Sequence, residues 1–295
     1  MQNFIMQGYR AFSLRVSLLV LALVLAGCSA VRFGYANGDT FVYWWLNGYV
    51  DFTDDQKPWV KGHIDNLLAW HRKTQLKDYA QILARVQQRL QQKVTSADVL
   101  SEYATVKKRA LLVLDKATPE LTELALSLQP QQIAHLEKKL ASNNDKYRRE
   151  YLRGSLEERQ ERRYEQVMKH AEYWFGNFSE QQQAQIRAAS DARPVNYELW
   201  LAERTRRQQE LLRMLRKFQT ERPPKDIAAA AVKSYIAASS EHFTYSENKA
   251  FFDASNEGTA QMAALIINIA TPAQKAHAMK RLQKWIEDCE TLAQK

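Results

Sequence analysis

The sequence predicts an all-α protein, an extended multi-helix bundle that follows a cleaved lipoprotein signal peptide. Three observations support this class. Apolar residues recur at intervals of three and four along most of the chain, without the strict alternation of a half-buried strand. Only 9 glycines and 7 prolines occur in 295 residues, which disfavours a turn-rich β-sandwich and favours long helices. Residues 1–27 have the layout of a signal peptide.

The amino-terminal segment is interpreted as a lipoprotein signal peptide. Arg10 and Arg15 lead, without any acidic residue, into the apolar run 16–26. This run is shorter than the roughly 20 residues that a membrane-spanning helix needs. It ends in a Leu-Ala-Gly-Cys sequence that resembles the bacterial lipobox, so we expect cleavage between Gly27 and Cys28 and lipidation of Cys28. The alternative is an ordinary signal peptide beside a chance cysteine.

Lipidation of Cys28 sets the expected compartment and the first partner, the membrane. Palmitate-type acyl chains bury methylene groups at about 0.8 kcal/mol each and so anchor a protein to a bilayer. Ser29 follows the cysteine, as in lipoproteins directed to the outer membrane, so we expect the protein on the periplasmic side of that membrane. Cleavage removes two arginines and no acidic residue, so the formal net charge falls from +9 to +7, and this positive charge faces anionic lipid or lipopolysaccharide; nucleic acid is not expected as a partner.

Residues 28–60 are predicted to form a lipid-anchored, aromatic-rich segment. Trp44 and Trp45 lie in it. Rings in such density serve either as core anchors or as contact surface at an interface, and the core interpretation is favoured. The acidic stretch 51–55, followed by Lys57 and Pro58, predicts a helix start at the end of this segment.

Residues 61–225 are predicted to form the main helical domain. Helices are expected at about 60–92, from Thr95 or Ser96 to about Lys116, from Pro119, at about 130–175 and at about 196–220. The 130–175 helix is rich in charge, and a Gly-Ser pair at 154–155 marks a kink or break within it. A double proline at 223–224 ends the domain. Residues 226–295 are expected to add two or three closing helices, the last with a buried Cys289 thiol.

One local pattern recurs three times. A glutamine follows three residues after a polar helix-cap candidate at Gln129, Ser179 and Thr271. At Ser179 and Thr271 the pattern predicts a capping box, in which the cap hydroxyl accepts a bond from the third helical N–H and the glutamine reaches back. The spacing between the copies is not constant, so a solenoid of repeats is not expected.

No catalytic residue, metal site or cofactor is predicted. The chain lacks the nucleophile elbow, the paired-histidine zinc motif, the dinucleotide fingerprint and a complete phosphate loop. Residues 246–249 match the Ser-x-x-Lys spacing of penicillin-binding enzymes, but the companion Lys-Thr-Gly is absent. His63 and His71 are too far apart on a helix to share a metal without a ligand between them, and a structural role beside Trp70 is favoured for His71.

Several short segments are distinctive: Phe33-Gly34-Tyr35, Tyr43-Trp44-Trp45-Leu46, Tyr49-Val50-Asp51-Phe52, Trp70-His71-Arg72, Gln75-Leu76, Tyr79-Ala80, Asn144-Asp145-Lys146-Tyr147 and Leu199-Trp200-Leu201-Ala202-Glu203-Arg204. Together they resemble an uncharacterised family of proteobacterial lipoproteins, a domain of unknown function, over essentially the whole mature chain. The resemblance implies no activity. The helix starts at 128–136, 178–186 and 270–278 are similar to LTxxQ-type helices of small periplasmic chaperones and to helices of membrane-tethered lipase foldases.

The sequence therefore favours a lipid-anchored envelope protein of helical binding or scaffold type, acting like a chaperone towards an envelope client. The first alternative is a binder of anionic lipid or lipopolysaccharide through the basic helix faces 148–163 and 204–217. An envelope hydrolase, with carboxylates brought together by the fold, ranks third. The candidate binding-surface residues are Trp44, Trp45, Trp70, His71, Arg149, Arg153, Arg206 and Arg207.

Overall fold

The computed structural model describes residues 30–240 and 247–294. Over this part of the chain it contains eleven α-helices, one π-helical turn and no strand, which confirms the all-α, multi-helix prediction. The expected cleavage and lipidation sites, Gly27 and Cys28, lie outside the described residues. The elements are α2 (Ala30–Ala36), α3 (Gly38–Val50), α4 (Gln56–Arg89), α5 (Ser96–Ser127), α6 (Pro130–Tyr147), η1 (Arg148–Leu152), α7 (Leu156–Phe175), α8 (Glu180–Ala192), α9 (Tyr197–Glu221), α10 (Lys225–Ser240), α11 (Lys249–Ile269) and α12 (Pro272–Ala293).

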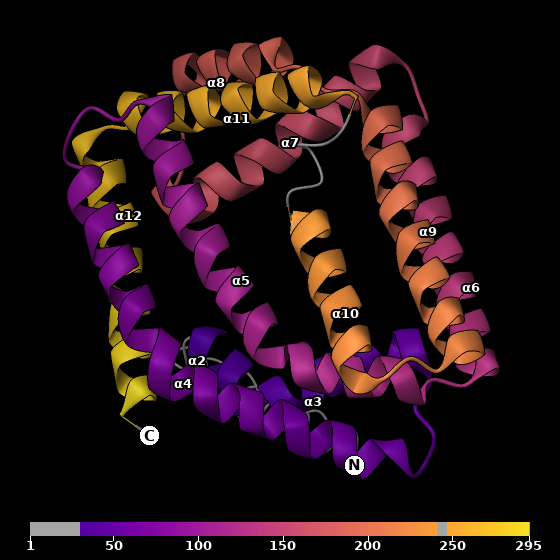
Figure 1. Ribbon diagram of the computed structural model, residues 1–295. Coiled ribbons are helices and arrows are strands. Elements are labelled where there is room, and N and C mark those ends of the chain that lie inside the picture. Colours follow the sequence, from indigo (N-terminus) through magenta and orange to yellow (C-terminus); the bar gives the residue numbers. More distant parts are fainter. Residues whose placement is uncertain (1–29, 241–246, 295) are drawn as a thin grey trace, which may run out of the picture.

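The helices lie along the sides of a frame that α5 and α10 cross (Figure 1). One side pairs α12 with α4, and the opposite side pairs α6 with α9. Helices α7, α8 and α11 form a third side, and α2 and α3 lie along the fourth with part of α4. Because α10 and α11 pack on α5 and α12 packs on α4, the segment expected to close the chain returns to its earliest long helices.

Helix α5 is continuous, so the prediction of one helix ending near Lys116 and another beginning at Pro119 is wrong. Pro119 lies inside the helix, where it removes one backbone hydrogen bond. The hydroxyls of Thr118 and Thr122 bond the carbonyls one turn back, at 2.8 and 2.7 Å, a habit that bends helices without ending them. Figure 1 shows α5 changing direction towards its carboxyl-terminal end.

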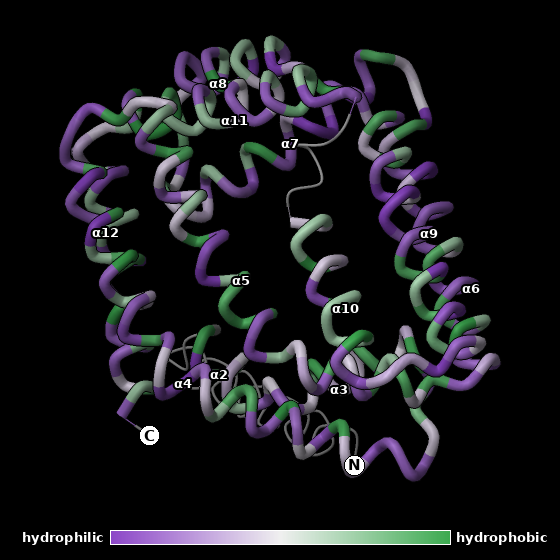
Figure 2. The backbone as a smooth tube through the Cα atoms, in the orientation of Figure 1, coloured by the Kyte–Doolittle hydropathy of each residue, from purple (hydrophilic) through white to green (hydrophobic). Residues whose placement is uncertain are grey.

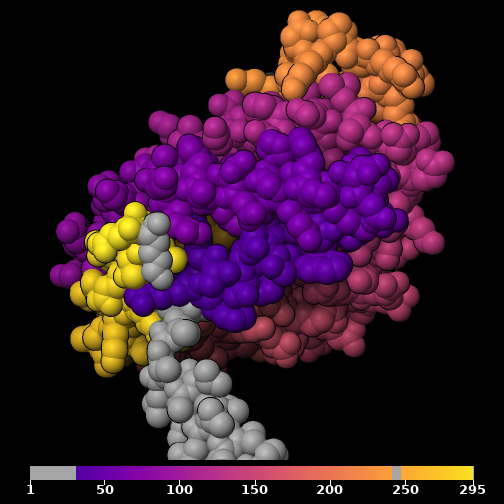
Figure 3. Space-filling model, turned by 90° about the horizontal axis from the view of Figure 1, so that it is seen from below, coloured from indigo at the N-terminus to yellow at the C-terminus, as the bar shows by residue number. Residues whose placement is uncertain are grey.

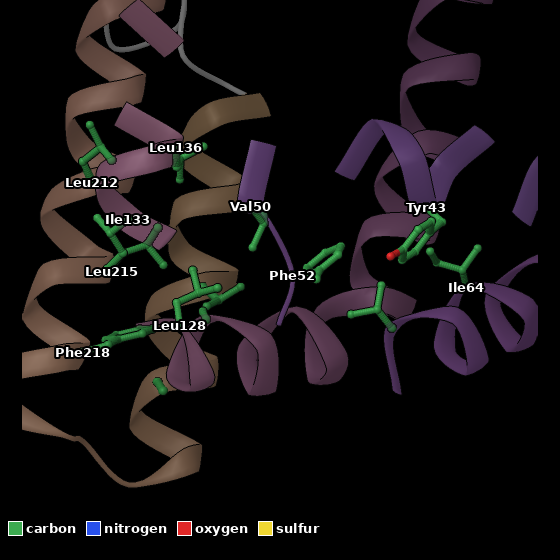
Figure 4. Close-up of a cluster of buried hydrophobic side chains, with 14 residues drawn as sticks. Tyr43, Val50, Phe52, Ile64, Leu128, Ile133, Leu136, Leu212, Leu215 and Phe218 are labelled. Carbon is green, nitrogen blue, oxygen red and sulfur yellow. The ribbon is translucent and has the colours of Figure 1, made fainter. Parts of the chain in front are cut away.

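Three clusters of buried side chains hold the frame together. Figure 4 shows the first, where Val50 and Phe52 meet Leu128, Ile133 and Leu136 of the α5–α6 corner and Leu212, Leu215 and Phe218 of α9. The second joins α7, α8, α11 and α12 around the fully buried Ile186. In the third, Leu76 and Ala80 of α4 pack against Ile286, Cys289 and Leu292 of α12.

Most of the helices are amphipathic, α7 the most strongly and the long α4 the least. Figure 2 shows hydrophobic and hydrophilic residues alternating along each helix. None of the helices described combines the length and the apolar character that a segment crossing a bilayer requires. The buried Cys289 thiol is confirmed, and burial raises its pKa.

Both predicted capping boxes are confirmed, and their helix starts pair with each other. Gln182 and Gln274 accept bonds from the cap N–H groups of Ser179 and Thr271 at 2.9 and 2.8 Å. Their amides also bond one another, at 2.9 and 3.2 Å. Each amide donates a second bond across the pair, from Gln182 to the carbonyl of Ile269 at 2.8 Å and from Gln274 to that of Asn177 at 2.6 Å. The starts of α8 and α12 are thereby joined by a local two-fold arrangement.

A fourth copy of the pattern, which the sequence analysis missed, begins α4. Gln56 accepts a bond from the N–H of Thr53 at 3.1 Å, the same three-residue relation. It pairs with Gln132 of the copy that begins α6, through amide bonds of 2.7 and 3.4 Å. The Gln132 amide also reaches the carbonyl of Asp51 at 3.1 Å. Two corner pairs, α4 with α6 and α8 with α12, are therefore built by the same device.

Candidate ligand-binding cleft

A cleft of about 690 Å³ lies among η1, α7, α11 and the chain that joins α8 to α9. Its lining is of two kinds. An apolar part is made by Val167, Trp174, Phe175, Met262, Ile266 and Ile267. A polar part contains four arginines, Arg159, Arg162, Arg163 and Arg193, with Glu150 and Glu165 beside them. The cleft thus offers cations and apolar surface to the same molecule.

Local sequence explains how α7 supplies both kinds of lining. Arg159 and Arg163 stand one turn apart, and Val167, Ala171 and Trp174 continue the same face at helical spacing. Helix α7 begins directly after the Gly-Ser pair at 154–155, which confirms the break predicted there. Gly154 has a φ of 90°, which a residue with a side chain adopts only under strain, and Ser155 makes a capping box with Glu158.

The cleft arginines are incompletely paired. Arg163, whose side chain is only 9% exposed, reaches Asp191 at 3.5 Å, and Arg159 reaches Glu198 at 3.5 Å. Charge-assisted bonds are usually 2.7–2.9 Å long, as in the bidentate pair of Arg187 with Glu161 just outside, at 2.7 and 2.9 Å. The Nε atoms of Arg159, Arg163 and Arg193 are buried without a hydrogen-bond partner. The long separations of Arg159 and Arg163 from their carboxylates leave room for closer contact with an anion.

Two effects disfavour the positive charge of Arg193: its burial and its repulsion by Arg163. Burial, and after it the charge of Arg163, lowers the pKa of Arg193. Arg193 donates a hydrogen bond of 3.2 Å to the hydroxyl of Thr259. Tyr151 and Tyr197 stack at 5.2 Å on the wall of the cleft, and burial, followed by a hydrogen bond with Glu150, raises the pKa of Tyr151. The Tyr151 hydroxyl therefore stays protonated near neutral pH and can donate.

The predicted basic residues do not converge on this cleft. Arg149 and Arg153 are exposed near η1 and do not line it, although the Arg153 carbonyl accepts a 2.5 Å bond from Arg162. Arg206 is held by Glu203 and Glu210 along α9, and Arg207 also lies near Glu203, at 3.7 Å. In the 204–217 face, Lys217 likewise pairs within α9, and Arg216 pairs with Glu137 of α6, whereas the 148–163 face contributes three of the cleft arginines.

The predicted aromatic residues occupy different places. Trp44 and Trp45 are exposed on α3, which contradicts their assignment to the core. Trp70 lines a second groove of about 350 Å³ among α3, α4 and α5. His71 contacts the Tyr35 hydroxyl and the rings of Trp70 and Tyr79, and burial lowers its pKa, in agreement with a structural role.

Metal-ligating side chains do not gather in the part of the chain described. Within it, no three His, Cys, Asp or Glu side chains lie close enough to hold a metal ion. Ser246 of the Ser-x-x-Lys match lies outside the described residues.

The contribution of Arg193 to the cleft was not predicted from the sequence, because Arg193 lies on the short connection after α8 and only the fold brings it to α7.

Comparison with known families gives one finding. DUF6279, a family of unknown function, matches residues 48–228, more than half of the chain. The chain belongs to this family. The matched region contains all four cleft arginines, while the apolar residues from α11 lie beyond it. No curated protein and no solved structure matches the chain significantly.

Proposed function

We propose that this protein binds an amphiphilic anion in the cleft of α7 and α11. The ligand class is a molecule with a phosphate or carboxylate head and an apolar chain, such as an anionic lipid or part of lipopolysaccharide. The observation that carries the proposal is the presence of partly buried, incompletely paired guanidinium groups beside an apolar wall. Arginine is suited to this task because its planar fork meets both oxygens of a phosphate or carboxylate.

The size of the cleft agrees with this ligand class. Small-molecule sites usually measure about 300–1,000 Å³, so a cavity of about 690 Å³ admits a headgroup with part of one chain. Burial of an apolar chain contributes about 25 cal/mol for each Å² removed from water. Head and chain therefore both add to affinity, and a ligand that lacks either should bind more weakly.

The expected setting is the cell envelope. We propose that Cys28 is the lipidated first residue of the mature protein and that it holds the protein at the outer membrane, facing the periplasm. The support is the signal-peptide layout and the lipobox-like end of residues 1–28. Amphiphilic anions are the abundant small ligands at such a surface.

Binding of dodecyl phosphate, measured by calorimetry, tests the proposal. We expect it to bind at least about tenfold more tightly than inorganic phosphate or dodecanol, because each lacks one half of the recognised chemistry. Arg163→Ala and Arg193→Ala should each weaken binding about tenfold. The control Arg187→Ala removes an exposed arginine whose partner is Glu161, and it should change the affinity less than twofold. Equal effects of all three substitutions would contradict a defined site.

A polypeptide client is a second candidate, and α5 provides the observation for it. Tyr103, Val106, Leu112 and Leu114 are exposed on this helix, where it crosses the frame. Exposed apolar side chains in such number favour a contact surface. Photo-crosslinking from position 103 in intact cells should capture an envelope protein under this hypothesis, and should capture none if the cleft alone binds ligand.

A further inference from the structure

Helices α2 and α3 present exposed rings on one face. Phe33 is 58% exposed, Phe41 51%, Trp44 64% and Trp45 63%. Phe41, Trp44 and Trp45 follow the i, i+3, i+4 spacing that places side chains on one side of a helix. The Phe33 ring of α2 lies 6.1 Å from that of Phe41 and so joins them. These four residues are called the aromatic face below.

The aromatic face is not needed to hold α3 in place. The opposite side of α3 buries Tyr43 and Val50 in the first core cluster. No charged residue occurs between Phe41 and Val50, so nothing on this stretch of helix opposes removal from water. A contiguous set of large exposed rings is uncommon on a soluble surface and marks a contact with a partner or a membrane.

The short length of chain between Cys28 and Phe33 favours a bilayer as the partner of the aromatic face. Phe33 is five residues beyond Cys28, and a chain spans at most about 3.6 Å per residue, so a lipid on Cys28 keeps Phe33 within about 18 Å of the membrane surface. Figure 3 shows that the early residues, drawn in indigo, form the side of the molecule seen from below, where α2 and α3 lie in Figure 1. The helices that carry the aromatic face therefore follow the proposed anchor directly along the chain.

We propose that the aromatic face inserts into the headgroup region of the bilayer and fixes the orientation of the protein on the membrane. Tryptophan is favoured in this region because its ring is apolar and its N–H finds polar partners. Amphipathic helices that lie in the interface bury their apolar side about 5–10 Å deep. The acyl anchor keeps the protein from leaving the membrane, and the inserted rings keep it from rotating on the membrane surface. The biological setting rests on the proposed lipidation of Cys28, but the chemistry of the face does not.

Quenching of tryptophan fluorescence tests this inference. The protein is purified from membranes and mixed with vesicles of phosphatidylethanolamine and phosphatidylglycerol whose acyl chains carry bromine near the carbonyl end. Bromine quenches only rings that enter the bilayer. We expect quenching in the native protein, and loss of most of it in Trp44→Phe/Trp45→Phe, which keeps the face apolar but removes its reporters.

The matched control is Trp200→Phe, which removes a tryptophan of α9 that does not line the cleft and whose ring meets that of Phe252 edge-on at 5.2 Å. It should leave the quenching unchanged. Because the face is apolar, the quenching should persist in about 0.5 M salt, which screens binding through basic helix faces. Absence of quenching in the native protein overturns the proposal, as does quenching that the Trp44 and Trp45 substitutions leave intact.

Mass spectrometry of the amino-terminal peptide separates this proposal from that of lipidation. If the protein is acylated but its tryptophans are not quenched, insertion of the aromatic face is refuted and the lipid anchor stands. Protein without the acyl group that is still quenched on addition of vesicles supports the face and refutes the anchor. Capture of one envelope protein by a photo-crosslinker at position 41, with no quenching, would show that the face binds protein instead of lipid.

Discussion

Removing one of the paired glutamines provides a quantitative test of how the frame is held together. The Gln182 side chain makes four hydrogen bonds between 2.8 and 3.2 Å: it accepts from the N–H of Ser179 and from the Gln274 amide, and it donates to the carbonyl of Ile269 and to Gln274. A typical bond contributes about 1 kcal/mol net to the free energy of unfolding. Gln182→Ala should therefore reduce that free energy by about 2–3 kcal/mol.

The partner substitution makes the prediction sharper. Gln274→Ala removes the equivalent bonds and should cost a similar amount. In the double variant the two amides no longer leave each other unpaired, so its cost should fall short of the sum of the single costs by about 1 kcal/mol or more. Gln181→Ala is the control, because Gln181 is the exposed neighbour on the same helix, and it should shift stability by less than about 0.5 kcal/mol.

The assay is urea denaturation followed by far-ultraviolet circular dichroism and by tryptophan fluorescence, whose transitions must coincide for the free energies to be comparable. The reasoning fails if Gln182→Ala costs no more than Gln181→Ala. It also fails if the two glutamine costs add fully, because then the amides do not act as a pair.

Other perturbations have expected outcomes. Gly154→Ala should cost about 1–3 kcal/mol because the φ of 90° is strained for alanine and the new methyl meets the Glu158 carboxylate; thermal unfolding should show the loss, and an unchanged midpoint would refute it. Burial lowers the pKa of His71, so its neutral form contributes stability that is present above the unfolded-state pKa of about 6.5 and is lost as the pH falls below it; the urea midpoint should decrease from about pH 7 to about pH 5 less steeply in His71→Gln than in the native protein. The buried Cys289 thiol, with its raised pKa, should react with iodoacetamide far more slowly in the folded protein than in urea, and equal rates would contradict its burial.

Much of the fold could be predicted from local sequence. Helical periodicity, the capping boxes at Ser179 and Thr271 and the break before Ser155 are each encoded within a few residues. The helix predicted at about 196–220 agrees closely with α9. Proline at 119 misled the prediction because a helix interior tolerates proline when tertiary packing and side-chain hydroxyls compensate for the lost bond.

The rest depended on contacts between distant segments. The helix start near residue 56 was predicted from the acidic stretch 51–55, but the role of Gln56 was not, because its partner Gln132 lies far away in the sequence. The glutamines that pair at the helix starts are not separated by a constant number of residues, so a search for sequence repeats does not detect the pairing. The cleft could be predicted in part, since Arg159 and Arg163 continue the apolar stripe of α7, but Arg193 and the α11 wall are brought there only by tertiary structure.

The pairing of α12 with α4 also constrains the order of events during biosynthesis. Leu76 and Ala80 emerge from the ribosome some two hundred residues before Ile286, Cys289 and Leu292, which cover them in the finished molecule. Until the last helix is made, the apolar stripe of α4 has no native cover, and it must be shielded by transient contacts or by helper proteins. Deletion of α12 should therefore produce an aggregating polypeptide instead of a shorter folded one.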